Sequence, residues 1–108
     1  MNPFVEIATD TTFDAVIQAA TRPVIVDFWA AWCQPCLRVN PILDALAEER
    51  ADALTVAKVN VDEEPELARR FGIQSIPTLI RFDGGKETHR VIGVYPKSHL
   101  LAQLGLEE

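Results

Sequence analysis

The apolar residues of this chain switch repeatedly between the two-residue spacing of a strand and the three-to-four-residue spacing of a helix. Along its 108 residues the pattern reads strand, helix, strand, helix, strand, helix, strand, strand, helix, with no internal repeat or linker. This order predicts an α/β fold, in which helices cover both faces of a mixed sheet. We expect early strands to be parallel, late strands to be antiparallel, and residues 1–108 to form one domain.

The first half of the chain contains the segment that best predicts a central strand. Val24–Trp29 is nearly continuous in apolar residues, which is typical of a strand buried on both faces, and Asp27 is its one charged member. Before it, Thr11–Asp14 resembles a capping box that opens a helix. After Cys33 a second helical stripe begins, and it continues through Pro41, so we predict a bend there rather than a break.

The second half predicts a strand at 54–61 and a short helix that ends at Gly72, where a left-handed cap is usual. Two further strands, at 78–82 and 90–94, flank a turn rich in Asp and Gly and should pair as an antiparallel hairpin. A final helix follows, with Ser98 as its predicted cap.

The only two cysteines stand three positions apart in the segment Trp32-Cys33-Gln34-Pro35-Cys36. Two thiols at this spacing can close a small disulfide ring and open it again. They end a predicted strand and begin a predicted helix, whose free N–H groups and partial positive charge stabilise a thiolate. The segment therefore predicts dithiol–disulfide exchange, with two buried thiols or half of a metal site as the alternatives.

Position within the predicted helix suggests different tasks for the two thiols. Cys33 lies nearest the helix start and the solvent, so it is the candidate nucleophile, whereas Cys36, one turn inward, would resolve the mixed disulfide. Asp27 stands on an apolar strand, and desolvation would raise its pKa toward the range useful for general acid–base catalysis. Alternatively, Asp27 is a partly buried strand residue whose oxygens are satisfied by hydrogen bonds.

Charge and ligand content argue against several other functions. The chain has 10 basic and 16 acidic residues, a net charge of −6, which argues against a nucleic-acid partner. Its most apolar stretch is too short to span a bilayer and the N-terminus lacks an export signal, so we expect no membrane partner and a cytoplasmic location. A zinc site usually needs four ligands, and only His89 and His99 could join the cysteines. We therefore expect no metal and two ordinary surface histidines.

These features together resemble the thioredoxin family over nearly the whole chain. The matching residues are Asp27 in its β-run, Trp32-Cys33-x-Pro35-Cys36, Pro41, Lys58, Gly72-Ile73, Ile76-Pro77-Thr78 and Gly93. The resemblance implies a thioredoxin fold, with a mixed sheet of four or five strands and about four helices on its two faces. It also implies reversible reduction of protein disulfides, with Pro77 in a cis peptide facing the cysteines.

The resemblance further implies roles for individual residues. Asp27 would help to deprotonate Cys36, with Lys58 as its charge partner, although a strand lysine often extends to solvent instead. Backbone groups beside the cis peptide would bind an extended substrate segment through β-like hydrogen bonds. The expected substrate-binding surface comprises Trp32, Ile76, Pro77, Gly93 and Val94.

Two residues depart from the commonest family pattern. Gln34 replaces the usual glycine between the cysteines, where it should influence the reduction potential, while the retained Pro35 argues for a reducing member. Leu37 stands where a basic residue is frequent, which removes a positive charge and adds an exposed apolar contact.

The resemblance implies a protein-disulfide reductase that is recharged by a thioredoxin reductase carrying a nicotinamide cofactor. This chain shows no dinucleotide-binding glycine fingerprint, so we expect no bound cofactor other than the redox-active disulfide Cys33–Cys36. We expect disulfide-containing proteins as substrates and a monomer. The alternatives are a non-catalytic thioredoxin-fold interaction or chaperone module, and an oxidase- or isomerase-like protein, which the missing export signal disfavours.

Overall fold

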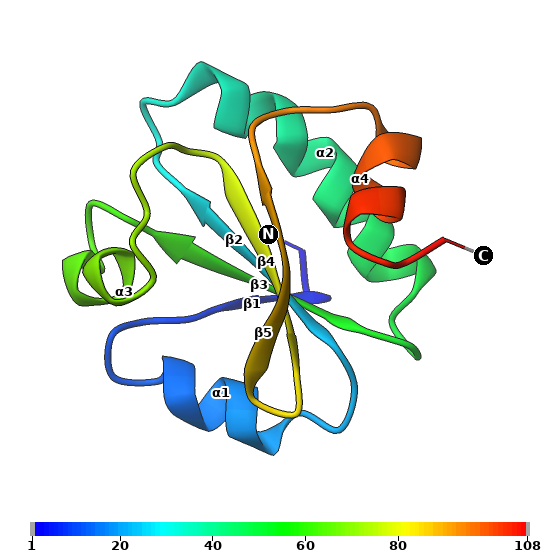
Figure 1. The fold of residues 1–108 in the computed structure, drawn as a ribbon, viewed down its shortest axis with the longest axis horizontal. Helices are drawn as coiled ribbons and strands as arrows, with labels where there is room; N and C mark the ends of the chain where they lie inside the picture. The colour runs from blue at the N-terminus through cyan, green and yellow to red at the C-terminus, as the bar shows by residue number, and fades with distance from the viewer. Residues whose placement is uncertain (1, 108) are drawn as a thin grey trace.

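The computed structural model describes residues 2–107, and its strands and helices follow the predicted order. Figure 1 shows them coloured along the chain. In chain order they are β1 (Val5–Ile7), α1 (Phe13–Ala19), β2 (Val24–Trp29), α2 (Gln34–Glu49), β3 (Thr55–Asn60), α3 (Pro65–Arg70), β4 (Thr78–Asp83), β5 (Lys86–Ile92) and α4 (Lys97–Gln103). The α2 helix runs through Pro41 without a break, and the bend expected there stays a prediction.

The five strands form one sheet in the order β1-β3-β2-β4-β5. β3 pairs in parallel with both β1 and β2, whereas β4 is antiparallel to β2 and β5 is antiparallel to β4. This confirms the mixed sheet and the change from parallel to antiparallel pairing. β2 is the central strand, so its apolar run is hydrogen-bonded along both edges.

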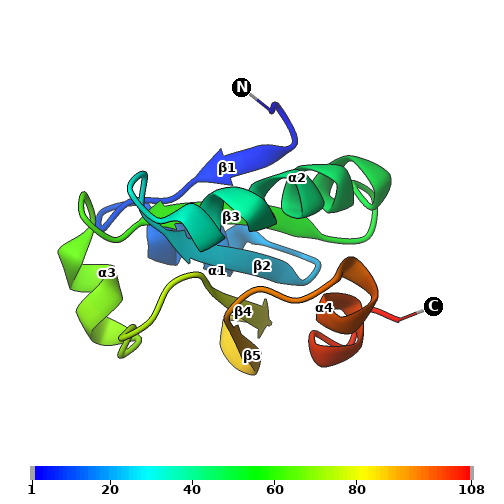
Figure 2. The same ribbon diagram turned by 90° about the horizontal axis from the view of Figure 1, so that it is seen from above.

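Helices cover both faces of the sheet, with α2 and α4 on one side and α1 and α3 on the other (Figures 1 and 2). Successive strand residues point to opposite faces. Val24, Val26 and Phe28 accordingly join the apolar cluster beneath α1 and α3, while Ile25 joins the cluster beneath α2 and α4. Asp27 follows the alternation of Ile25, so its carboxyl lies on the face that α2 covers.

Three local predictions were wrong, and each has a local structural reason. β5 spans Lys86–Ile92 instead of 90–94: it begins directly after the two-glycine turn, and it ends at Ile92 because Gly93, at φ +102°, leaves the extended conformation. Pro96 is the N-cap of α4, so Ser98 lies inside the helix. Thr12 caps α1 without a side-chain cap bond, because its Oγ1 accepts from the Thr9 N–H at 2.9 Å. None of these changes moves a strand or a helix.

Candidate functional site

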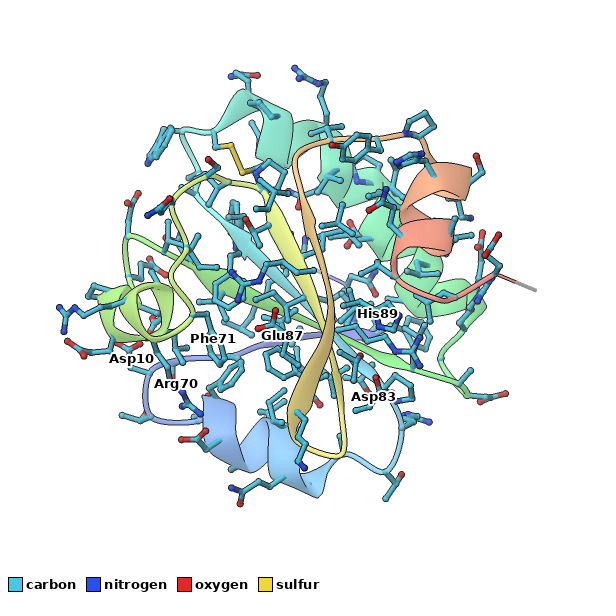
Figure 3. All side chains as sticks on the ribbon, viewed as in Figure 1. Asp10, Arg70, Phe71, Asp83, Glu87 and His89 are labelled. Atoms are coloured by element: carbon cyan, nitrogen blue, oxygen red, sulfur yellow. A yellow bond between two sulfur atoms is a disulfide. The ribbon has the colours of Figure 1, made fainter. Side chains whose placement is uncertain are left out.

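A disulfide joins Cys33 and Cys36 at the N-terminal end of α2, and Figure 3 shows it as a yellow bond. Cys33 is the N-cap of the helix, in an extended backbone conformation, and its Sγ accepts the Cys36 N–H at 3.2 Å. Pro35 occupies the first turn, where a missing N–H costs no helical hydrogen bond. Cys33 is 4% exposed and Cys36 is fully buried. Both cysteines are thus buried, Cys33 slightly less so, and its sulfur faces a helix N–H.

A tight turn brings the end of β2 to the start of α2. The Cys33 N–H donates to the Ala30 carbonyl at 3.1 Å, just beyond the last residue of the strand. Ala30 and both cysteines form a small buried cluster, against which Trp29 and Ile76 pack. The reactive sulfurs thus lie between the central strand and the loop that precedes β4.

The loop before β4 lies directly beside the outer sulfur. The Ile76–Pro77 peptide is cis, as the resemblance implies. Cys33 Sγ lies 3.8 Å from the Ile76 carbonyl oxygen, and the Gly93 N–H donates to the Pro77 carbonyl at 2.9 Å. The structure therefore brings Ile76, Pro77 and Gly93 together next to Cys33. Val94 is half-buried and adjoins this group only as the residue after Gly93.

Exposed apolar side chains accompany the disulfide. Trp32 is 68% exposed, and its Nε1–H donates to Asp62 Oδ2 at 2.7 Å across the turn after β3. Leu37, in the first turn of α2, is 40% exposed, and Gln34 is exposed beside it. No period or motif marks Asp62 in the sequence, so its contact with Trp32 was not predicted.

Asp27 is fully buried, and neither of its carboxylate oxygens has a hydrogen-bond partner among residues 2–107. Desolvation raises the pKa of Asp27 to about 7, although the Lys58 charge acts to lower it and the Asp44 charge raises it further. No protein group among residues 2–107 therefore satisfies this carboxyl with a hydrogen bond. The sequence-based expectation of a raised pKa is confirmed.

Lys58 is the β3 partner of Asp27 in the parallel β2–β3 pair. Its side chain is only 12% exposed, and its Nζ donates to Asn40 Oδ1 at 3.1 Å and lies 3.7 Å from Asp44 Oδ1. The lysine therefore lies against α2 instead of extending freely into solvent. Asn40 and Asp44 were not predicted as site residues, although both follow Cys36 at four-residue intervals and so lie on the same side of the helix as that cysteine.

The remaining candidates lie away from this group. Within residues 2–107, no group of three or more His, Cys, Asp or Glu side chains is arranged to hold a metal ion. His99 is exposed and stacks on Tyr95 at 4.6 Å, whereas His89 is half-buried, with Nδ1 2.9 Å from Thr88 Oγ1. None of the helices in the described part of the chain is long and apolar enough to cross a membrane.

Known proteins match this chain over most of its length. A thioredoxin family model matches residues 4–105. A thioredoxin from Alicyclobacillus acidocaldarius subsp. acidocaldarius is 55% identical over 96 residues, covering 89% of this chain and 90% of that protein. A thioredoxin from Mycobacterium tuberculosis is 49% identical, with 89% and 83% covered. A bifunctional thioredoxin reductase/thioredoxin from Mycobacterium leprae is 48% identical, and the match spans 89% of this chain and 21% of that longer protein.

The comparisons and the site agree on one chemistry. The matched region contains the sheet, the Cys33–Cys36 disulfide and the cis peptide beside it. The redox group is the cysteine pair itself, which supports protein-disulfide reductase activity. The chain therefore belongs to the thioredoxin family of thiol–disulfide oxidoreductases.

Proposed function

We propose that this chain reduces protein disulfides with Cys33 as the attacking thiol and Cys36 as the resolving thiol. The observation that carries this assignment is the N-cap geometry, in which the Cys36 N–H points at Cys33 Sγ from 3.2 Å. In the dithiol form the same N–H and the helix N-terminus stabilise a Cys33 thiolate. Cys36 is fully buried, so a bulky substrate meets Cys33 first.

The proposed cycle has two exchange steps. The Cys33 thiolate attacks one sulfur of the substrate disulfide, forms a mixed disulfide and expels the other substrate sulfur as a thiolate. Cys36 then loses its proton and attacks Cys33 Sγ, which closes the Cys33–Cys36 disulfide and releases the second substrate sulfur. Two electrons pass to the substrate, and its two thiolates take up protons.

We propose that Asp27 accepts the proton that the Cys36 thiol loses. Its carboxyl lies on the sheet face beneath α2, and its pKa of about 7 lets it accept and return a proton near neutral pH. Lys58, paired with it across the strands, supplies the positive charge that limits the rise of this pKa.

We assign substrate contact to the surface around the outer sulfur. The backbone at Ile76 and Pro77 would pair with an extended substrate segment, as strand-like peptides bind to exposed backbone. Trp32, Gly93 and Val94 would contact its side chains, while Gln34 and Pro35 tune the reduction potential.

We infer a thioredoxin reductase as the electron donor. The Mycobacterium leprae relative, which joins a thioredoxin reductase and a thioredoxin in one protein, supports this assignment. We further propose that residues 1–108 act as one domain and as a monomer, in a reducing cytoplasm where cysteine pairs stay available for exchange.

The test is reduction of a protein disulfide by wild type, Cys33→Ser and Cys36→Ser in the presence of thioredoxin reductase and its nicotinamide cofactor. We expect Cys33→Ser to be inactive and Cys36→Ser to accumulate a mixed disulfide that mass spectrometry detects. Trapping by Cys33→Ser alone would reverse the two roles. Full biological activity of both variants would instead favour a non-catalytic interaction module.

The direction of electron flow needs a separate measurement. Equilibration of the cysteine pair against glutathione gives its reduction potential, and a reductase should lie at or below the glutathione pool. A potential well above that pool would favour the oxidase- or isomerase-like alternative.

A further inference from the structure

The Lys58 ammonium does not bind the carboxyl of Asp27, its partner on the neighbouring strand. Lys58 and Asp27 are direct partners in the β2–β3 pair, and side chains of such partners leave the sheet on the same face. Even so, both carboxylate oxygens of Asp27 lack hydrogen-bond partners within the described part of the chain. The Lys58 head group therefore contacts something else.

Two side chains of α2 hold this ammonium. Asn40 Oδ1 accepts a hydrogen bond from Lys58 Nζ at 3.1 Å, and Asp44 Oδ1 lies 3.7 Å from the same nitrogen. Residues four apart share one side of a helix, so Asn40 and Asp44 form a continuous acceptor edge. Cys36 lies one turn earlier on that edge, which links the lysine contacts to the helix that carries the resolving thiol.

The lysine has room to take other positions. Lys58 and Asp44 line a surface pocket of about 300 Å³ together with Trp29. A lysine stem is flexible, and its ammonium has three donors to distribute. In the observed position the ammonium donates a hydrogen bond to Asn40, and the Asp44 carboxylate lies slightly farther away.

We propose that Asn40 is a positioning residue: its amide oxygen holds the Lys58 ammonium against α2 and so keeps the Asp27 carboxyl free of a direct ion pair. The inference rests on the proposed function, in which Asp27 accepts the proton of Cys36. A carboxylate in a direct ion pair would stay ionised and bind a proton too weakly for this task. The Asn40 amide oxygen is a neutral acceptor, so it holds the lysine away from Asp27 without adding a charge of its own.

The charges that act on Asp27 come from two elements. Among residues 2–107, Lys58 on β3 lowers the pKa of Asp27 and Asp44 on α2 raises it. On the β4 side the partner of Asp27 is the uncharged Leu79. In the reduced protein the cysteine thiols at the start of α2 are further titrating groups on this face of the sheet.

Two substitutions of Asn40 should therefore shift the pKa of Asp27 in opposite directions. Asn40→Ala releases Lys58 toward Asp27 and should lower that pKa. Asn40→Asp keeps an acceptor of the same shape but adds a negative charge, so it should raise that pKa. A general loss of packing would not produce opposite signs at one position. Alanine also has a higher helix propensity than asparagine, so the first variant should fold.

The experiment follows the carboxyl carbon of Asp27 by NMR during a pH titration of the reduced, full-length protein, with Asp27→Asn to assign the signal. We expect the midpoint to fall by about one unit or more in Asn40→Ala, the lower end of the range for a carboxylate that gains a close opposite charge. We expect it to rise in Asn40→Asp. The pH profile for resolution of a mixed disulfide should move with the midpoint in both variants.

A Lys58→Gln background provides the matched control, because Asn40 acts only through Lys58 in this proposal. There, Asn40→Ala should cause no further shift, as a double-mutant cycle requires for a single pathway. An unchanged midpoint in Asn40→Ala alone, or a shift that persists in the Lys58→Gln background, would overturn the proposal. Midpoints that move as expected while the resolution profile stays fixed would support the positioning by Asn40 and overturn the role of Asp27 in the proposed function.

Discussion

Asp27 should make the stability of this protein fall as the pH rises from acid to neutral. Burial raises its pKa from the ordinary 3.8 to about 7. Between these values the folded state keeps a proton that the unfolded state has released, so the free energy of unfolding decreases with pH. At 1.36 kcal/mol for each unit of pKa shift, the loss reaches about 4 kcal/mol once both states are ionised. Below the unfolded pKa both states hold the proton, and no loss occurs.

The perturbation that isolates this effect is Asp27→Asn, which keeps the shape of the side chain and removes its charge. Urea unfolding of wild type and variant, from about pH 4 to about pH 8.5, gives the two free energies of unfolding. The oxidised protein is used because disulfide cysteines do not titrate. The difference should grow in favour of Asp27→Asn by up to about 4 kcal/mol across this range.

A surface substitution controls for the loss of one negative charge. Glu48 lies exposed on α2, so Glu48→Gln should run nearly parallel to wild type over the same range. If the Asp27→Asn and wild-type curves also stay parallel, the Asp27 carboxyl is ionised in the folded protein at little cost. The proton-transfer step assigned to it would then lose its physical basis.

Two further substitutions test the proposed substrate surface at Trp32 and the close packing of Gly105 against His89. Trp32→Ala should slow reduction of a protein disulfide about tenfold, as loss of an exposed aromatic anchor does, while reduction of a small disulfide and the stability change little; equal slowing of both substrates would contradict a contact role. Gly105→Ala should destabilise the fold more than Gly84→Ala in urea unfolding. Both glycines have positive φ, but of the two only Gly105 would bring its new Cβ against a side chain, with His89 Nε2 at 2.9 Å. Equal losses would show that His89 moves aside freely.

Features that depend on neighbouring residues were predictable from the sequence. The apolar run Val24–Trp29 indicated a buried central strand, and the structure places it at the centre of the sheet. The three-residue spacing of Cys33 and Cys36, just after that run, indicated a disulfide at a helix start. Both features depend on the spacing of residues close together in the chain, so they can be predicted from the sequence alone.

Features that depend on contacts between distant segments were not predictable. Nothing near Asn40 indicates that its amide oxygen meets a lysine 18 positions later. That no group within residues 2–107 bonds to the Asp27 carboxyl likewise became visible only when the surrounding elements were in place, because a buried aspartate more often has hydrogen bonds. Ser98 failed as a predicted cap because Pro96 already held the backbone in the geometry that starts α4.

The features that oppose stability gather at one end of the sheet. Asp27 is buried without a hydrogen bond from any residue of 2–107, Trp32 exposes a large apolar surface, and Gly93 takes a positive φ where β5 stops. In open α/β sheets the carboxyl ends of the central strands are where ligands bind, and β2 ends here. Proteins break the rules of stable folding mainly where function needs the exception. The buried carboxyl of Asp27 is such an exception: ionising it weakens the fold near neutral pH, and its raised pKa is the property that the proposed proton transfer from Cys36 requires.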